Sequence, residues 1–176
     1  MKVSTSRKTV AAPRARERRA AYAAQHTPAA ARKPTRGLLD VNVLIALLDA
    51  DHLHHRPATD WLEDHIGAGW ASCAITQNGC LRNMSQPGYP NPLSTAQVAA
   101  RLRAATQTRH LLFVPSSASL LDEARFDTTQ LLSQLQVTDA WLLGLAVAHG
   151  LRLVTFDARL PLRVVRGATA ADLVVL

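Results

Sequence analysis

Short apolar runs alternate with amphipathic segments from Gly37 to the end of the chain. An apolar run of only a few residues, bounded by polar or turn-forming residues, predicts a strand buried in a sheet. By this criterion the chain has strands at 37–39, 70–75, 110–115 and 152–156, and two short candidates at 162–165 and 172–176.

The segments between these runs have the spacing of amphipathic helices. One helix is predicted to begin directly after Asp40, and others lie at 57–67, 76–85, 95–105 and 139–149. Ser94 and Thr138 are suitable N-caps for the last two helices, and Gly150 is placed to end the last one as a C′ glycine. Strands that alternate with helices predict an α/β fold of three layers, α/β/α, around a central parallel sheet.

The basic character of the chain is concentrated at its N-terminus. Residues 1–36 hold ten Lys and Arg against a single acid, Glu17, so they carry +9, while the remaining residues carry −2 of the total of +7. The segment has almost no large apolar side chains and cannot bury enough surface to offset its ordering entropy. We therefore predict a disordered basic arm, or an isolated and poorly packed helix, at 1–36, and one globular domain at 37–176.

Three interpretations of residues 1–36 compete. The segment resembles an organellar transit peptide in being Arg-rich and acid-poor, but its Ala- and Arg-rich composition is typical of a GC-rich bacterial genome and disfavours that interpretation. A flexible arm that binds RNA phosphates fits the sequence. A start codon assigned too early, with the natural chain beginning near Gly37, fits it equally well, and the sequence does not decide between these two.

Composition and motifs disfavour several functional classes. No apolar run approaches the ~20 residues that cross a bilayer, and the N-terminus lacks the apolar core of a secretory signal, so we expect a cytoplasmic protein with no membrane partner. Cys73 and Cys80 are too few for a disulfide scaffold or a zinc site and are predicted to be buried thiols. The G-x-G-x-x-G and Walker signatures of nucleotide binding are absent from the sequence.

Three aspartates are placed where an α/β fold concentrates function. Asp40 and Asp157 each follow a predicted strand directly, and Asp139 begins a helix that enters at the same edge of the sheet. Converging acids repel one another unless a cation is bound, and carboxylate oxygens suit Mg²⁺ or Mn²⁺. The arrangement indicates metal-assisted hydrolysis of a phosphodiester. Each acid also has a plainer interpretation: a helix cap for Asp40, a favourable charge at a helix start for Asp139, and a turn residue for Asp157.

Four motifs give this pattern a family resemblance. LDVNVLIALLD (39–49) resembles the opening motif of PIN domains, and ITQNGCLRN (75–83) resembles their second motif, a strand followed by an N-G-x-x-R helix. TDAWLLGLAVAHGLRLVTFD (138–157) is similar to the third and fourth motifs, a TDA helix followed by a strand that ends T-x-D. The N-G-x-x-R form resembles VapC-like toxins of toxin–antitoxin pairs, so the resemblance implies a metal-dependent endoribonuclease.

The resemblance also implies a role for individual residues. Asp40, Asp139 and Asp157 would be ligands of Mg²⁺ or Mn²⁺. Asn42 and Thr155 would orient these ligands, or waters, from outside the first coordination sphere.

Two residues of the second motif complete the implied catalytic set. Arg82 would bind the scissile phosphate with its guanidinium group. Gln77 stands where many members of the family carry Glu as a fourth acid, and it would supply a neutral oxygen instead. The loss of one negative charge predicts a weaker cation site, or occupancy by a single ion.

The partners implied by the resemblance are RNA as substrate, a cognate antitoxin whose C-terminal segment occupies the cleft, and a second copy of the chain in a homodimer. Two alternatives stand beside this interpretation. One is a catalytically weak or inactive PIN-fold module that binds RNA or an antitoxin, and the other is a phosphohydrolase that acts on small phosphate esters. His52, His54 and His55 resemble a cluster of metal ligands, but we expect them to form a polar loop instead.

Overall fold

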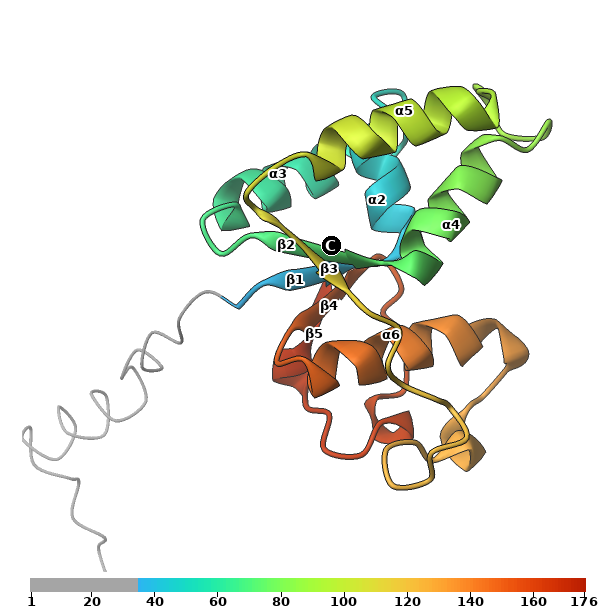
Figure 1. Cartoon of the computed structure of the whole chain (residues 1–176). Helices are drawn as coiled ribbons and strands as arrows, with labels where there is room; N and C mark the ends of the chain where they lie inside the picture. The colour runs from blue at the N-terminus through green and yellow to red at the C-terminus, as the bar shows by residue number, and fades with distance from the viewer. Residues whose placement is uncertain (1–34) are drawn as a thin grey trace, which may run out of the picture. The chain divides into compact units, whose positions relative to one another are not determined.

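The structure is a computed structural model that describes residues 35–176. The arm predicted at 1–36 lies outside the described residues except for its last two positions. Within the described range, parallel strands form one five-stranded sheet in the order β3-β2-β1-β4-β5 (Figure 1). The strands are β1 (Gly37–Leu39), β2 (Trp70–Cys73), β3 (Leu111–Val114), β4 (Arg152–Thr155) and β5 (Leu173–Val175).

Helices connect the strands in the part of the chain that the structure describes. The α-helices are α2 (Val41–Leu48), α3 (His55–His65), α4 (Ala74–Met84), α5 (Thr95–Thr106) and α6 (Val137–Ala148). Short 3-10 helices are η1 (Thr128–Gln130), η2 (Gln134–Gln136), η3 (Leu162–Val164) and η4 (Ala170–Asp172). Among residues 35–176, no helix has both the length and the apolar character needed to span a membrane.

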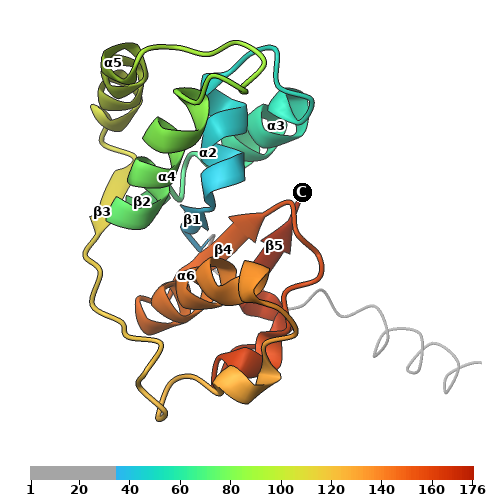
Figure 2. The ribbon, with the colours of Figure 1, turned by 90° about the vertical axis from the view of Figure 1, so that its right-hand side faces the viewer.

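Apolar side chains form one core on each face of the sheet. Figure 2 shows the helices that cover the two faces. Helices α2 to α5 lie on one face, where Leu44 of α2 packs in the same core as Leu39 of β1. Helix α6 lies on the other face, where Leu143 packs in the same core as Phe126 and Leu38 of β1. Leu38 and Leu39 thus serve opposite faces, as the two-residue period of a strand requires. The predicted three-layer α/β/α architecture is confirmed.

The strand predicted at 162–165 is wrong. Leu162–Val164 form the 3-10 helix η3, and Val165 makes only an isolated antiparallel bridge to Phe126. Val164 and Val165 are both buried in the core on the α6 side of the sheet. The apolar run therefore closes a core, which a strand pattern of the same length does not distinguish from pairing in a sheet. The strand predicted at 172–176 is confirmed as β5.

Three helix starts differ from the prediction. Helix α3 begins at His55, two residues before its predicted start. Helix α6 begins at Val137, so Thr138 lies inside its first turn and the predicted N-cap is wrong. The 3-10 helix η2 runs directly into α6, which removes the need for a side-chain cap. Helix α4 begins at Ala74, two residues before its predicted start. The end of α6 is as predicted, because Gly150 has the left-handed φ of 64° that suits a C′ glycine.

The sheet order places the functional candidates side by side. Strands β1 and β4 are neighbours, with Leu39 paired to Val154, so the residues that follow them lie at the same edge. The backbone N–H of Asp40 continues this pairing and donates to the Val154 carbonyl at 3.0 Å. Asp40 is also the N-cap of α2, so one residue ends a strand and begins a helix. The carboxyl edge of β1 and β4 is therefore where the site is built.

Candidate metal centre

Asp40 is held at the centre of this edge. Its Oδ1 accepts the Val41 N–H at 2.6 Å, and its Oδ2 accepts the Thr155 hydroxyl at 3.0 Å. The residue is only 5% exposed. Burial, reinforced by the negative charge of Asp157, raises the pKa of Asp40 above its usual range, against the opposing effect of its two hydrogen bonds. The fold thus fixes the orientation of a carboxylate whose charged form is costly.

Thr155 links two of the acids through one hydroxyl group. The Thr155 Oγ1 donates to Asp40 Oδ2 and accepts the backbone N–H of Asp157 at 3.1 Å. Thr155 is itself buried at the end of β4. Because the hydroxyl uses both its donor and its acceptor capacity, it sets the position of Asp157 relative to Asp40.

Asp139 approaches the same place from the other layer. It lies in the first turn of α6 and is partly buried. Burial raises its pKa to about 6, and the negative charges of Asp40 and Asp157 add to the effect. The three carboxylates are therefore close enough to interact electrostatically. They come from the end of β1, the start of α6 and the segment after β4. Carboxylate oxygens under mutual repulsion are the donors that suit Mg²⁺ or Mn²⁺.

Asp157 differs from the other two acids because it has a positive partner. Arg159 donates from Nε to Oδ1 and from Nη2 to Oδ2, both at 3.0 Å. These hydrogen bonds lower the pKa of Asp157 below its usual range. Among residues 35–176, no three His, Cys, Asp or Glu side chains are arranged to hold one metal ion. Sequence reasoning missed Arg159; its only signal was a position two residues after Asp157 in a turn.

Gln77 is placed by a neighbouring strand. Its Nε2 donates to the Ser72 hydroxyl of β2 at 2.9 Å. Ser72 is completely buried, so this hydrogen bond fixes the amide against the sheet. This partner could not be predicted from the sequence, because the pairing depends on the position of a helix side chain over a strand.

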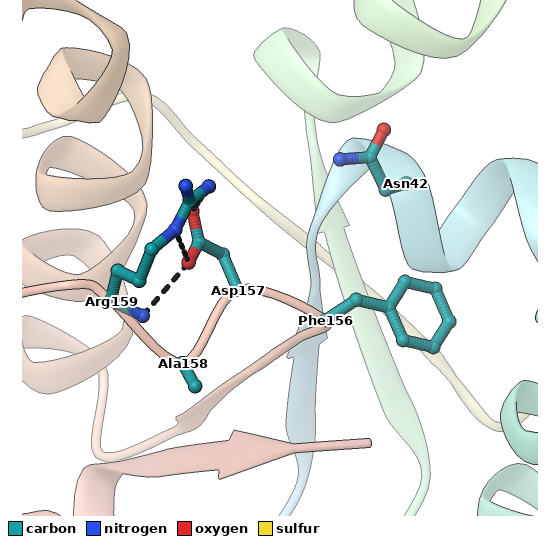
Figure 3. A pocket seen from close by; sticks show the side chains of 5 residues that line it. All are labelled: Asn42, Phe156, Asp157, Ala158 and Arg159. Carbon is teal, nitrogen blue, oxygen red and sulfur yellow. Dashed lines mark hydrogen bonds and ion pairs between the residues drawn. The ribbon is translucent and has the colours of Figure 1, made fainter.

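Asn42 and Arg82 line two different hollows at this edge. Asn42 borders a hollow of about 490 Å³ together with Phe156, Asp157, Ala158 and Arg159 (Figure 3). Arg82 borders a hollow of about 310 Å³ whose other lining residues are Val41, Ile75, Asn78, Gly79 and Thr138. The second hollow includes the sequence neighbours of Asp40 and Asp139, so it adjoins the acids as the first does. Arg82 and Asp157 therefore do not share one pocket.

A glycine of α4 shapes the second hollow. A Cβ on Gly79 would lie 2.7 Å from the Val41 Cγ2 of α2, which is shorter than carbon atoms tolerate. Only glycine lets α4 approach α2 this closely. The Gly of the N-G-x-x-R motif is therefore a packing requirement that brings Asn78 and Arg82 close to the start of α2.

The histidine-rich segment lies next to the site and is used for packing. The His54 ring stacks on Phe156 with ring centroids 4.5 Å apart. The His55 Nδ1 lies 2.7 Å from the Ala46 carbonyl of α2, and the His52 Nδ1 accepts the His54 N–H at 3.1 Å. These contacts tie the segment to α2 and to the residue between Thr155 and Asp157.

Comparison with known proteins agrees with this architecture. The PIN domain family model matches residues 37–166. Ribonuclease VapC44 of Mycobacterium tuberculosis is 52% identical over 141 residues, which cover 80% of this chain and 99% of that protein. Ribonuclease VapC38 of the same organism is 38% identical over 122 residues, which cover 69% of this chain and 84% of the relative.

A solved structure shows a more distant likeness. The crystal structure of VapBC2 from Rickettsia felis, bound to a DNA fragment from their promoter, aligns with a TM-score of 0.49 and 16% identity, covering 71% of this chain and 92% of that chain. The family model and the two VapC relatives establish the family without this structure. The chain belongs to the PIN-domain family and, within it, to the VapC ribonucleases.

Proposed function

We propose that this protein is an endoribonuclease that hydrolyses RNA phosphodiester bonds with Mg²⁺ or Mn²⁺ and acts as the toxin of a toxin–antitoxin pair. One observation carries the proposal: three carboxylates from separate elements lie within electrostatic reach of one another at one sheet edge, where burial and mutual repulsion raise the pKa of two of them. A fold retains such an unfavourable cluster when a cation or a reaction requires it. The names of the similar proteins, ribonucleases VapC44 and VapC38, supply the substrate class.

Asp40, Asp139 and Asp157 would hold the divalent cation, and Gln77 would offer a neutral oxygen in place of a fourth acid. A bound cation of this kind supplies a nucleophilic hydroxide at neutral pH and stabilises the charge that develops on the phosphate. Asp40 is the natural first ligand, because the Val41 N–H and the Thr155 hydroxyl already fix its orientation.

The other residues act by positioning. Thr155 would keep Asp40 and Asp157 at a constant separation through its two hydrogen bonds. Arg82, exposed on α4, would bind the phosphate from the hollow that adjoins Asp40 and Asp139. Asn42, exposed at the start of α2, would orient a water or a nucleotide in the other hollow.

The proposal extends to partners. Membership in the VapC group implies a cognate antitoxin whose C-terminal segment covers the acidic edge, a homodimer, and action on RNA in the cytoplasm. A co-expressed antitoxin that abolishes RNA cleavage, and that protects the N-terminal turns of α2 and α6 from hydrogen exchange, would support this assignment.

The experiment that tests the activity is cleavage of a mixed RNA pool by the purified chain with Mn²⁺, beside the variants Asp40→Asn, Asp157→Asn and Gln77→Glu. We expect cleavage that EDTA and both Asp variants abolish, and that Gln77→Glu strengthens by restoring a fourth charge. A wild-type protein that binds RNA without cutting it, while Gln77→Glu cuts, would identify a disabled member of the family. Cleavage that persists in both Asp variants would contradict the proposed site.

A further inference from the structure

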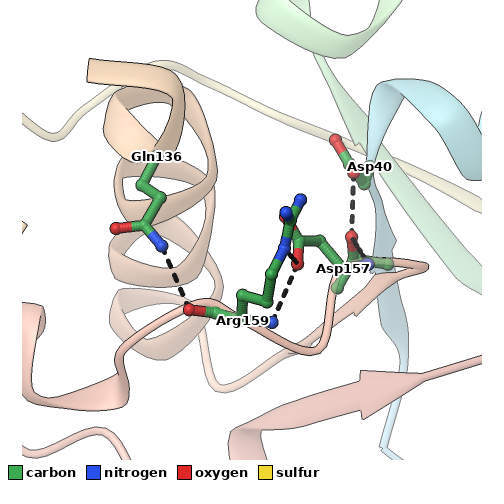
Figure 4. Close-up of polar contacts among 5 residues, drawn as sticks. Asp40, Gln136, Asp157 and Arg159 are labelled. Carbon is green, nitrogen blue, oxygen red and sulfur yellow. Dashed lines mark hydrogen bonds and ion pairs between the residues drawn. The ribbon is translucent and has the colours of Figure 1, made fainter. Parts of the chain in front are cut away.

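Arg159 binds both oxygens of the Asp157 carboxylate. Its Nε and Nη2 each donate to one carboxylate oxygen at 3.0 Å, and its backbone N–H donates to Oδ1 at 2.8 Å (Figure 4). A guanidinium that binds both oxygens of a carboxylate is the strongest arrangement open to such a pair. A cation that uses Asp157 as a ligand must therefore compete with Arg159, both for the oxygens and through repulsion between positive charges.

The side chains of Arg159 and Asp157 are exposed enough for their ion pair to break and re-form. The Arg159 side chain is 85% exposed and that of Asp157 is 28% exposed. Ion pairs that face solvent are weakly held, because water screens the attraction and a long side chain loses freedom when it is fixed. A divalent cation held by several carboxylates is thus able to displace the guanidinium.

The backbone of Arg159 stays fixed when its side chain leaves Asp157. The Nε2 of Gln136 donates to the Arg159 carbonyl at 3.1 Å, and the Oε1 of Gln136 accepts the Leu132 N–H at 3.0 Å. Gln136 is buried, so this anchor belongs to the packed part of the domain. A released Arg159 side chain therefore remains at the border of the hollow of about 490 Å³ that Asn42 and Phe156 also line (Figure 3).

A free guanidinium beside this hollow suits one kind of ligand. Its planar fork binds two oxygens of a phosphate as well as it binds those of a carboxylate. We propose that Arg159 is an exchangeable partner: it neutralises Asp157 before a divalent cation binds, and after the cation has taken Asp157 it binds a phosphate of an RNA strand lying in this hollow. This inference rests on the proposed nuclease function and adds a second phosphate-binding arginine to Arg82.

The test compares full-length protein with Arg159→Ala, Arg159→Lys and the matched control Arg163→Ala. Arg163 is exposed on η3, close in sequence, so its removal changes the net charge equally. Mn²⁺ affinity is measured by calorimetry without RNA. Binding of a fluorescent single-stranded RNA of mixed sequence is then measured across a salt series, once with Mn²⁺ and once with EDTA, at times when a gel shows the RNA intact.

Arg159→Ala is expected to bind Mn²⁺ about two- to fivefold more tightly, because the competing ion pair is gone. With Mn²⁺, its log–log salt dependence of RNA binding should fall by about 0.7, the loss of one phosphate contact on a single strand. With EDTA the slope should not change, because wild-type Arg159 is then engaged by Asp157. Arg163→Ala should leave Mn²⁺ affinity unchanged and alter RNA binding equally in both conditions, and Arg159→Lys should stay close to wild type in Mn²⁺ affinity.

Unchanged Mn²⁺ affinity in Arg159→Ala, or an equal change of slope with and without Mn²⁺, would overturn the exchange. RNA cleavage by the wild type is recorded in parallel to separate the two claims. If the wild type binds Mn²⁺ and cuts RNA while Arg159→Ala behaves like Arg163→Ala, only this inference fails. If the wild type neither binds Mn²⁺ nor cuts RNA, the proposed function fails together with it.

Discussion

Helix α2 has a buried aspartate at each end, Asp40 as its N-cap and Asp49 as its C-cap. Their exposed fractions are similar, 5% and 8%. Asp49 accepts the Tyr89 hydroxyl at 2.5 Å and the Asp51 N–H at 3.1 Å, which ties the loop between α4 and α5 to the end of α2. Asp40 also accepts two hydrogen bonds, but it faces the charge of Asp157.

The comparison separates a structural acid from a candidate functional one. Burial and hydrogen bonding are nearly the same at the two ends of the helix, so neither property identifies a site. The difference lies in the neighbours, because Asp40 and Asp157 both raise the pKa of a third acid, Asp139. We therefore expect substitutions at the Asp40 end to change activity and substitutions at the Asp49 end to change stability.

The largest effect is expected from Asp40→Asn in a cleavage assay with Mn²⁺. Loss of a charged ligand removes several kcal/mol of transition-state stabilisation, so the rate should fall by at least ~100-fold. Asp49→Asn is the matched control, because it has the same chemistry on the same helix and should retain nearly full cleavage. Equal losses in the two variants would break the comparison.

Tyr89→Phe is expected to lower stability and to leave cleavage almost unchanged. It leaves the buried Asp49 carboxylate without the hydroxyl that donates to it, which should lower the free energy of unfolding by about 1–2 kcal/mol. Chemical denaturation measures this loss, and cleavage per folded molecule should stay within about twofold of wild type. A drop in cleavage at full stability would place Tyr89 in the functional machinery.

Asp139 should make the cation-free protein less stable at neutral pH than in mild acid. Its pKa is about 6 in the folded state and about 3.9 in an unfolded chain, so the folded protein holds the proton more tightly. The contribution to stability is fully present below pH ~4 and is lost as the pH rises through about 6. Because the side chain is only partly buried, Asp139→Asn should regain only about 1 kcal/mol at pH 7.

This gain in stability should largely vanish at pH 4, where residue 139 is neutral in the folded state of both the wild type and the variant. Unfolding curves in EDTA at the two pH values provide the measurement. A variant that is less stable than wild type at pH 7 would show that the acids do not repel one another as inferred.

The smallest effect is expected from Arg56→Ala in the first turn of α3. Arg56 pairs with Asp60 one turn later at 2.8 Å, and both side chains are more than half exposed. Such pairs contribute about 0.3–0.5 kcal/mol to a helix. A change in melting temperature beyond a few degrees, or any change in cleavage, would mean that this surface has a role that its contacts do not show.

Much of the fold could be predicted because it depends on local apolar pattern. The buried runs at β1 and β4 and the amphipathic helices between strands were identified from spacing alone. The run at 162–165 was not, because a short apolar segment has the same pattern whether it pairs in a sheet or closes a core. The start of α6 was missed for a related reason: a preceding 3-10 turn replaced the side-chain cap that Thr138 was expected to supply.

The candidate site, like the fold, could be predicted from the sequence only in part. That Asp40, Asp139 and Asp157 meet follows from the rule that strand ends share an edge, and the structure brings them within electrostatic reach, while their metal-binding role stays a prediction. The partners of Asp157 and Gln77 could not be predicted. They depend on which of several donors a side chain selects in three dimensions, and neither Arg159 nor Ser72 stands out in the sequence.

The most direct test of the central claim is Mn²⁺ binding by calorimetry to wild-type protein, Asp40→Asn and Asp49→Asn, with no RNA present. If the acidic edge is a cation site, the wild type and Asp49→Asn bind Mn²⁺ with equal affinity, and Asp40→Asn binds it at least tenfold more weakly. If Asp40→Asn binds Mn²⁺ as tightly as the wild type, Asp40 is a structural cap like Asp49, and the cation site does not exist where we place it.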